Sequence, residues 1–221
     1  MTALTDIQFD AAAGVADAAP GDIRRDLAVI AEMIEPRSRV LDIGCGDGML
    51  LAHLARTKAV DGRGIELSQA GVNACVRSGL SVIQGDADHD LEAYPDGAFD
   101  YVVLSQTLQA THNPRLVLES LVRIGRRAIV SFPNFGYWRI RLSLLASGRM
   151  PRSSLLSNVW WDTPNIHLCT IRDFLELARD LGISTDRSLI LDSAGRRYPF
   201  GARGRLANLL AEQGVFLLRR P

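Results

Sequence analysis

Apolar positions along the chain follow two different patterns. Segments rich in apolar residues at 39–43, 62–67, 80–84, 99–105 and 126–132 predict short strands, and 99–105 is almost continuously apolar. The stretches between them place apolar residues three and four positions apart, as in helices with one buried face. Regular alternation of apolar strands with helices predicts an α/β fold whose parallel sheet is covered by helices on both faces.

Several of the predicted helices carry clear boundary signals. Ser68 is expected to be the N-cap of a helix whose stop is Gly79. Thr170 and Asp173 have capping-box spacing at the start of a later helix. Other helices are expected from Met49 onward and over 113–125. The first helix has an apolar face at spacings of four, three and four and should end near Pro36; that face consists of Ile23, Leu27, Ile30 and Ile34.

The regular alternation breaks after the fifth strand. Residues 133–169 contain a helical pattern at 137–148 followed by an irregular stretch, and they read as an insertion-like segment. Two more strands are expected at 183–192 and 214–220, with a helix before the second, which gives seven strands in total. We predict one domain over 21–221 and a flexible extension over 1–20, where Ala, Gly and Asp dominate.

Composition narrows the class of protein. The chain has 221 residues, 47% hydrophobic residues and a formal net charge of +0, which does not fit a general nucleic-acid binder. The three cysteines are far apart in sequence, so neither a disulfide framework nor a metal site is expected. No signal peptide and no apolar run long enough to span a bilayer is evident, so we expect a cytoplasmic protein without membrane contact.

The most informative local pattern is VLDIGCGDG at 40–48, where a predicted strand enters three closely spaced glycines and a helix follows. Glycines let the backbone turn tightly and let a ligand approach the main chain. Glu66 and Asp86 follow the next two strands at the same edge of the sheet. Together they predict a nucleotide-type site, whereas the glycines alone would also fit a tight turn without a ligand.

The spacing G-x-G-x-G, with Asp42 ahead of it, differs from the G-x-G-x-x-G of dinucleotide sites and suits an amino-bearing cationic ligand better than a phosphate. The pattern resembles the class I S-adenosylmethionine-dependent methyltransferases, which have a Rossmann-like seven-stranded sheet with an antiparallel final strand. In that family the loop lies against the methionyl and ribose parts, and the two acids bind ribose and adenine. The resemblance implies S-adenosylmethionine or S-adenosylhomocysteine as cofactor, bound by Asp42, Gly44, Cys45, Gly46, Glu66, Leu67, Asp86, Ala87 and Ser105.

The end of the fourth strand, LSQTLQ at 104–109, offers no good general base near neutral pH. A lone histidine at a helix start, His112, is more often a surface or capping group than a catalytic one. The catalytic residues therefore stay unknown, and the candidates that could polarise a substrate are His112, Tyr137 and His167.

A closer resemblance rests on SFPNFGYWRIR at 131–141 and DTPNIH at 162–167, together with GIELS, VIQGDAD and FDYVVLSQTLQ. These segments are similar to the methionine-biosynthesis protein MetW family from about residue 37 to near the C-terminus. The family usually has tyrosine where this chain has Trp161, and residues 1–20 have no obvious counterpart in it. The resemblance implies a methyltransferase-like protein that works alongside a homoserine O-acyltransferase of the MetX type.

WWDTPNIHLCT at 160–170 allows three interpretations: a protein interface, the wall of a substrate pocket, or a packed loop. His167 and Cys169 lack partners for a metal site, and we expect the arginines at 196, 197, 203 and 205 to be a solvated run. The interface or pocket residues are expected to be Phe135, Tyr137, Trp138, Arg139, Arg141, Trp160, Trp161, Asp162, Asn165 and His167.

Two functions remain open at this point. The first is an S-adenosylmethionine-binding accessory protein of methionine biosynthesis that associates with the acyltransferase and reports methionine status through the cofactor. The second is an active small-molecule methyltransferase, since methyl transfer chiefly needs positioning and an exposed nucleophile. A nicotinamide dehydrogenase fits poorly, and the sequence leaves the oligomeric state open.

Overall fold

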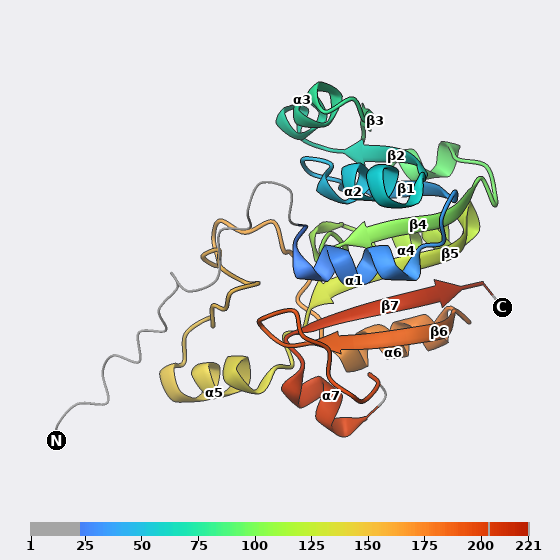
Figure 1. The fold of residues 1–221 in the computed structure, drawn as a ribbon. Helices are drawn as coiled ribbons and strands as arrows, with labels where there is room; N and C mark the ends of the chain where they lie inside the picture. The colour runs from blue at the N-terminus through green and yellow to red at the C-terminus, as the bar shows by residue number, and fades with distance from the viewer. Residues whose placement is uncertain (1–22, 203, 221) are drawn as a thin grey trace, which may run out of the picture.

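A computed structural model describes residues 23–202 and 204–220, and its centre is a seven-stranded sheet with the order β3-β2-β1-β4-β5-β7-β6 (Figure 1). All neighbouring strands are parallel except at β7, which runs antiparallel between β5 and β6. The predicted sheet and its strand count are confirmed. The strands are β1 (Arg39–Ile43), β2 (Asp61–Glu66), β3 (Ser81–Gln84), β4 (Phe99–Ser105), β5 (Gly125–Pro133), β6 (Ser184–Leu191) and β7 (Gln213–Arg219).

Helices cover both faces of this sheet (Figure 1). Apolar side chains of α1 and α2 pack on one face of the sheet, and those of α4 and α6 pack on the other. The helices are α1 (Arg25–Met33), α2 (Met49–Lys58), α3 (Gln69–Arg77), α4 (Pro114–Ile124), α5 (Trp138–Ser147), α6 (Ile171–Asp180) and α7 (Arg205–Leu210), with short 3₁₀ turns η1 (Asp90–Ala93) and η2 (Leu108–Ala110).

The boundary signals work as the sequence predicted. The Ser68 hydroxyl accepts the Gly71 N–H before α3, and Gly79 follows that helix with φ +73°. Thr170 and Asp173 form the reciprocal capping box of α6, in which each side chain accepts the other residue's backbone N–H. Because the caps satisfy backbone donors left free at helix starts, they fix where these helices begin.

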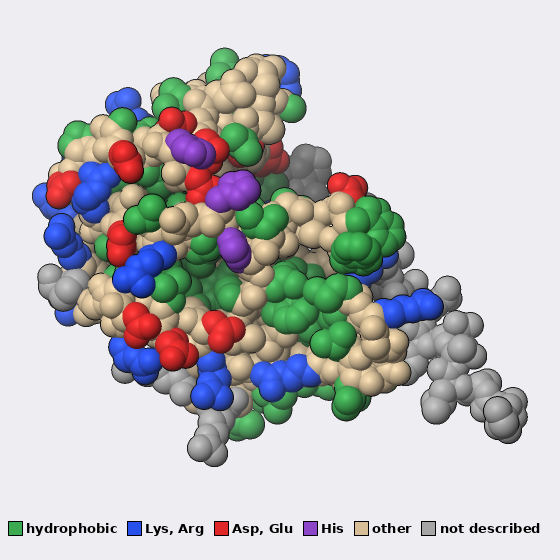
Figure 2. Space-filling view, turned by 180° about the vertical axis from the view of Figure 1, so that it is seen from behind, with side chains coloured by type: hydrophobic (Ala, Val, Ile, Leu, Met, Phe, Trp, Pro, Cys, Tyr) green, Lys and Arg blue, Asp and Glu red, His purple; other side chains and the backbone are tan. Residues whose placement is uncertain are grey.

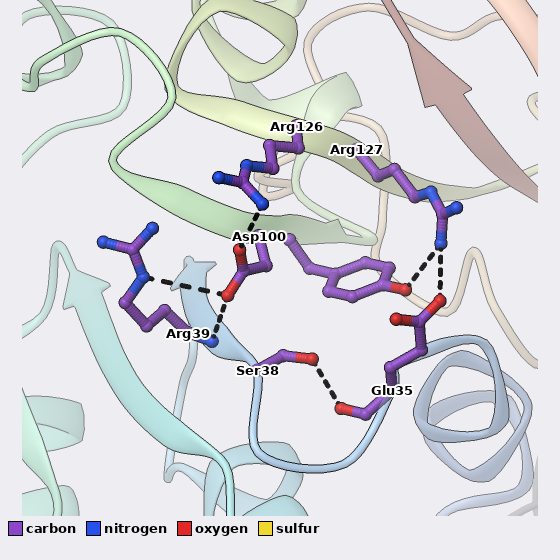
Figure 3. A network of polar contacts seen from close by, with 7 residues as sticks. Glu35, Ser38, Arg39, Asp100, Arg126 and Arg127 are labelled. Carbon is purple, nitrogen blue, oxygen red and sulfur yellow. Dashed lines mark hydrogen bonds and ion pairs between the residues drawn. The ribbon is translucent and has the colours of Figure 1, made fainter.

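The amino ends of three neighbouring strands are joined by charged side chains (Figure 3). Asp100 of β4 accepts the Arg39 N–H at 2.8 Å and forms ion pairs with the side chains of Arg39 and Arg126. Arg127 donates to both Glu35 and the Tyr101 hydroxyl at 2.9 Å. These pairs are partly exposed, so each adds little to the free energy of unfolding.

Residues between β5 and α6 form the insertion-like segment. Of α5, only Ile140 is buried, and residues 148–170 contain no helix or strand. The two ends of the segment meet at Asn134, a buried side chain that accepts the N–H groups of Gly136 and Ile171 at 3.0 and 3.1 Å. The segment is therefore anchored to the sheet at its base, and α5 extends away from the body (Figure 1).

The predicted extension over residues 1–20 lies outside the described residues. Within the described ranges, no helix combines the length and apolarity needed to cross a membrane.

Candidate functional site

The glycine loop after β1 is tied to the end of β2. The N–H groups of Gly44 and Cys45 both donate to the Ile65 carbonyl, at 2.8 and 3.2 Å. Glu66 binds two further donors with its carboxylate: the Gly46 N–H at 2.8 Å and the Ser68 N–H at 2.9 Å. The acid that the sequence assigned to a ligand thus also shapes the loop, since a carboxylate can accept more than two hydrogen bonds.

Glycine is required in this loop for two different reasons. A Cβ at Gly44 would lie 2.5 Å from the Thr107 hydroxyl, so the end of β4 packs directly on the backbone there. Gly46 has φ +59°, and a Cβ placed on it would meet nothing within 4 Å. The backbone at Gly46 therefore faces open space, as expected where a ligand approaches the main chain.

Asp42 lies beneath the loop as a buried carboxyl group. Its Oδ1 has no hydrogen-bond partner among the described residues. The pKa of Asp42 is raised to about 7, chiefly by burial and to a smaller extent by the negative charge of Glu66, while the positive charge of Arg24 opposes the shift. A buried, unpartnered carboxyl oxygen next to an open glycine loop fits a ligand that brings a hydrogen-bond donor or a positive charge.

The loop after β3 contains Asp86 and a second acid that sequence reasoning missed. Asp86 accepts the Asp88 N–H at 2.9 Å and lies 3.2 Å from the His89 ring, and these contacts hold the pKa of Asp86 below its usual range. Asp88 accepts the N–H groups of both His112 and Asn113, at 2.8 and 2.9 Å. Its carboxylate thereby links this loop to the start of α4, a contact between distant residues that local spacing does not reveal.

The end of β4 holds a second missed contact. Gln106 has φ +57° and donates from Nε2 to the Asp26 carboxylate of α1 at 2.8 Å. Asp26 is itself buried. Because a buried acid usually has a partner, an acidic residue at this position of the helix was the sequence signal from which the contact could have been predicted. Ser105, a predicted cofactor residue, shares a hydrogen bond with Ser131 at 3.1 Å.

The remaining predicted cofactor residues differ in how far their side chains are buried. The Cys45 thiol is buried against Leu51 and Cys75, and burial raises its pKa, so its side chain belongs to the core. Leu67 is 66% exposed beyond β2, and its carbonyl accepts from Gln84. Ala87 is half-buried and packs against the main core.

Two of the three candidate catalytic residues come together through a loop contact. The backbone carbonyl of Gln109 accepts the backbone N–H groups of Ile166 and His167 at 2.8 and 2.9 Å. The Nε2 atom of His167 lies 3.2 Å from the His112 carbonyl. The third candidate, Tyr137, precedes α5, where its ring packs against Trp138 with centroids 6.0 Å apart. The WWDTPNIHLCT stretch is therefore bonded to the segment that follows β4.

The tryptophans of that stretch do not fill space over the sheet. Trp160 and Trp161 meet edge to face at 5.6 Å, and each is 70% exposed, so interior packing does not explain them. Asp162 is exposed, and Asn165 donates from its backbone N–H to the Thr163 hydroxyl at 3.2 Å. Phe135 is half-buried and donates its backbone N–H to the Cys169 carbonyl at 3.0 Å.

Other predicted features fall outside this site. No group of three or more potential metal ligands occurs among the described residues. Arg196 and Arg197 form ion pairs with Asp192 and Glu32. Arg203 and the Arg205 side chain lie outside the described part, so the predicted basic run is described only in part.

Figure 2 shows how the side chains of this region are distributed over one face of the molecule. Histidine and acidic side chains gather next to a broad hydrophobic patch, with arginine or lysine side chains at the border of that patch. Polar and apolar halves of the region therefore lie side by side on the surface.

The architecture is that of class I methyltransferases. A methyltransferase from Archaeoglobus fulgidus described as S-adenosylmethionine-dependent superimposes with a TM-score of 0.64 at 14% identity, over 89% of this chain and 92% of that one. Another from Thermotoga maritima, described as a possible histamine N-methyltransferase, gives a TM-score of 0.62 at 15% identity, over 89% and 88% of the two chains. At such identities these likenesses establish the fold.

Sequence comparison gives the family. The model of the methionine biosynthesis protein MetW family matches residues 24–218, and the chain belongs to that family. It is also 37% identical over 186 residues to a bifunctional methionine biosynthesis protein MetXA/MetW from Rhodopirellula baltica. That match covers 79% of this chain and 30% of the relative, so the chain spans about a third of the relative's length.

Proposed function

We propose that the protein binds S-adenosylmethionine or S-adenosylhomocysteine at the carboxyl edge of β1 and β2. Asp42 would receive the ligand's amino group, the loop from Gly44 to Gly46 would lie along its backbone, and Glu66 would take the ribose hydroxyls. The observation that carries this proposal is the buried, unpartnered Asp42 carboxyl oxygen beside an open glycine backbone. A ligand ammonium group at this oxygen would satisfy it.

We further propose that the protein acts chiefly as an accessory subunit rather than as a methyltransferase. When bound, S-adenosylmethionine supplies an electrophilic methyl group. The residues after β4 that would receive a substrate beside it are already engaged, because Ser105 bonds Ser131 and Gln106 bonds Asp26. Neither a serine hydroxyl nor a glutamine amide is a good general base near neutral pH.

The proposed partner is a homoserine O-acyltransferase of the MetX type. A relative in which MetXA and MetW form one bifunctional chain supports this pairing, because fused chains commonly correspond to separate proteins that work together. Cofactor occupancy would adjust the partner's activity, so the acyltransferase would respond to methionine supply.

A continuous set of hydrogen bonds supports that regulatory role. Asp88, in the loop after β3, holds the backbone of His112, and the His112 carbonyl meets the His167 ring. A ligand that shifted the loop at Asp86 would therefore also move the stretch that carries the two exposed tryptophans. A regulatory ligand must bind two states of the protein with different affinity, and these bonds offer the contacts through which a change at the loop after β3 would reach that stretch.

An active small-molecule methyltransferase is the second candidate. The observation that favours it is the meeting of His112 and His167 near the acid loop after β3. Turnover of S-adenosylmethionine to S-adenosylhomocysteine with a carboxylic acid or amine acceptor would decide for this candidate.

The test is homoserine acylation by the purified acyltransferase from the same source, with and without this protein, at zero and saturating S-adenosylmethionine. Stimulation that changes with the ligand supports the accessory role and its regulation. Stimulation that is identical at both ligand levels removes the regulatory part. Absence of both stimulation and complex formation contradicts the accessory role, and the methyltransferase assay then becomes decisive.

A further inference from the structure

Helix α5 exposes an apolar stripe that the fold does not use. Trp138, Leu142 and Leu145 follow one another at spacings of four and three, so they lie on one side of the helix. They are 39%, 54% and 84% exposed, whereas only Ile140 of this helix is buried. A soluble chain gains no stability from such a stripe, which is typical of a binding surface.

The irregular stretch after α5 adds large apolar side chains of the same exposed kind. Trp160 and Trp161 form an edge-to-face pair with 70% of each side chain exposed. Met150 is 44% exposed as well. Tryptophan and methionine are enriched in protein interfaces, and tryptophan most often carries the binding free energy there.

The same segment carries an excess of positive charge, with Asp162, directly after Trp161, as its single acidic residue. Residues 134–161 contain four arginines and no aspartate or glutamate, although the whole chain has a formal net charge of +0. Within the described part of the chain, none of these four forms an ion pair with a carboxylate; Arg139 lies over the Trp138 ring at 5.4 Å, and Arg141 donates to the Gly136 carbonyl. The other two are Arg149 and Arg152.

The placement of charge around the stripe indicates the kind of partner. By helical rotation, Arg139 and Arg141 lie on opposite flanks of the Trp138–Leu142–Leu145 stripe. An apolar centre with a charged rim is the usual arrangement of a protein–protein interface. A helix that lies on a membrane instead separates a strongly charged face from an apolar face on the opposite side.

We infer that the exposed apolar side chains of the insertion-like segment, together with its four arginines, dock a protein whose apolar patch is bordered by carboxylates. These apolar side chains are Trp138, Leu142, Leu145, Trp160 and Trp161, and the set is called the α5 face below. This inference rests on the proposed function, in which that protein is the acyltransferase. His167, in the same irregular stretch as Trp160 and Trp161, contacts the His112 carbonyl near the proposed cofactor edge.

The test measures the dissociation constant of the complex with the purified acyltransferase for the wild-type full chain and four variants of it. Leu145→Glu and the double variant W160A/W161A are expected to raise the dissociation constant at least tenfold. Arg149→Glu should raise it about threefold or more, with the loss growing smaller as salt is added because screening already weakens the charge contacts. Val76→Glu, on α3 and 57% exposed, is the matched control and should bind like the wild type.

The outcomes separate the inference from the function on which it rests. If the wild-type chain forms no complex, the proposed partnership fails. If the wild type binds and Leu145→Glu and W160A/W161A bind within twofold of it, the α5 face is not the docking surface. Two other outcomes would also overturn the inference, provided that Leu145→Glu still binds the acyltransferase. If Leu145→Glu loses binding to vesicles containing phosphatidylglycerol, the face belongs to a membrane contact. If it loses self-association, the face belongs to a contact with a second copy of the chain. Unchanged S-adenosylmethionine affinity in each variant verifies folding.

Discussion

The backbone N–H of Gly46 donates to the Glu66 carboxylate at 2.8 Å, so the acid at the end of β2 holds the middle of the glycine loop. The other carboxylate oxygen of Glu66 accepts the Ser68 N–H at the start of α3. One side chain therefore links two loops that a ligand would contact together. Its loss should affect both the shape of the site and its contacts with ribose hydroxyls.

Glu66→Ala is expected to weaken S-adenosylhomocysteine binding at least tenfold, because it removes a ligand acceptor and frees the Gly46 N–H. Glu66→Gln keeps one acceptor oxygen and should lie between Ala and the wild type. Isothermal titration calorimetry checks the order. Glu176→Ala, at an exposed position of α6, is the control, and equal affinity in all four proteins would contradict the assignment.

The raised pKa of Asp42, about 7, makes ligand binding depend on pH. Below pH 7 the free site holds a neutral carboxyl group that attracts an ammonium group weakly, so affinity should rise between pH 6 and pH 8. Asp42→Asn should bind more weakly and lack this part of the pH dependence. Since the ligand ionises identically for both proteins, the difference between their pH profiles isolates Asp42.

Ligand affinity should rise with pH because of Asp42, whereas the free energy of unfolding should fall with pH for the same reason. Its folded-state pKa lies above the usual aspartate value of 3.8, so the folded chain holds a proton that the unfolded chain releases between about pH 4 and pH 7. The free energy of unfolding should therefore fall as pH rises through this window and then level off. Asp42→Asn should exceed the wild type by about 2 kcal/mol at pH 8 in urea unfolding and match it more closely at pH 4. A wild type as stable at pH 8 as the variant would contradict the buried charge.

His167 tests the link between the two halves of the region. His167→Ala removes the Nε2 contact to the His112 carbonyl but leaves the backbone bond to Gln109. We expect S-adenosylmethionine affinity to change less than about threefold, whereas the ligand should lose most of its effect on acyltransferase stimulation. His167→Gln offers a donor of similar reach and should restore part of the effect. Full ligand response in His167→Ala would exclude this connection.

Asn134 should be the most costly polar substitution in the insertion-like segment. Its amide donates to the carbonyls of Asn208 and Ala211 at 3.0 and 2.8 Å and accepts two backbone N–H groups. Asn134→Ala leaves these buried groups unpaired and should lower the free energy of unfolding by about 3 kcal/mol. Urea unfolding measures it, with the exposed Asn73→Ala as control at below about 0.5 kcal/mol. A small loss at Asn134 would mean that the segment is anchored elsewhere.

Local physics explains why much of the fold could be predicted. Apolar runs marked the strands, and caps at Ser68 and Thr170 fixed helix starts, because these signals act over a few residues. The glycine loop was recognisable for the same reason, since Gly46 needs its positive φ whatever surrounds it. The helical pattern at 137–148 likewise gave α5, although it gave no indication that this helix buries only Ile140.

The sequence by itself determined the succession of strands and helices along the chain, the glycine loop and the acids that follow β2 and β3. Only the tertiary structure decided which side chains meet: Asp88 with the backbone of His112, Gln106 with Asp26, and His167 with the His112 carbonyl. The exposure of Trp160 and Trp161 was decided there as well. The physical reason is that these contacts join residues that only the folded sheet brings together, whereas a residue's own sequence neighbours set its local conformation but not its distant partners.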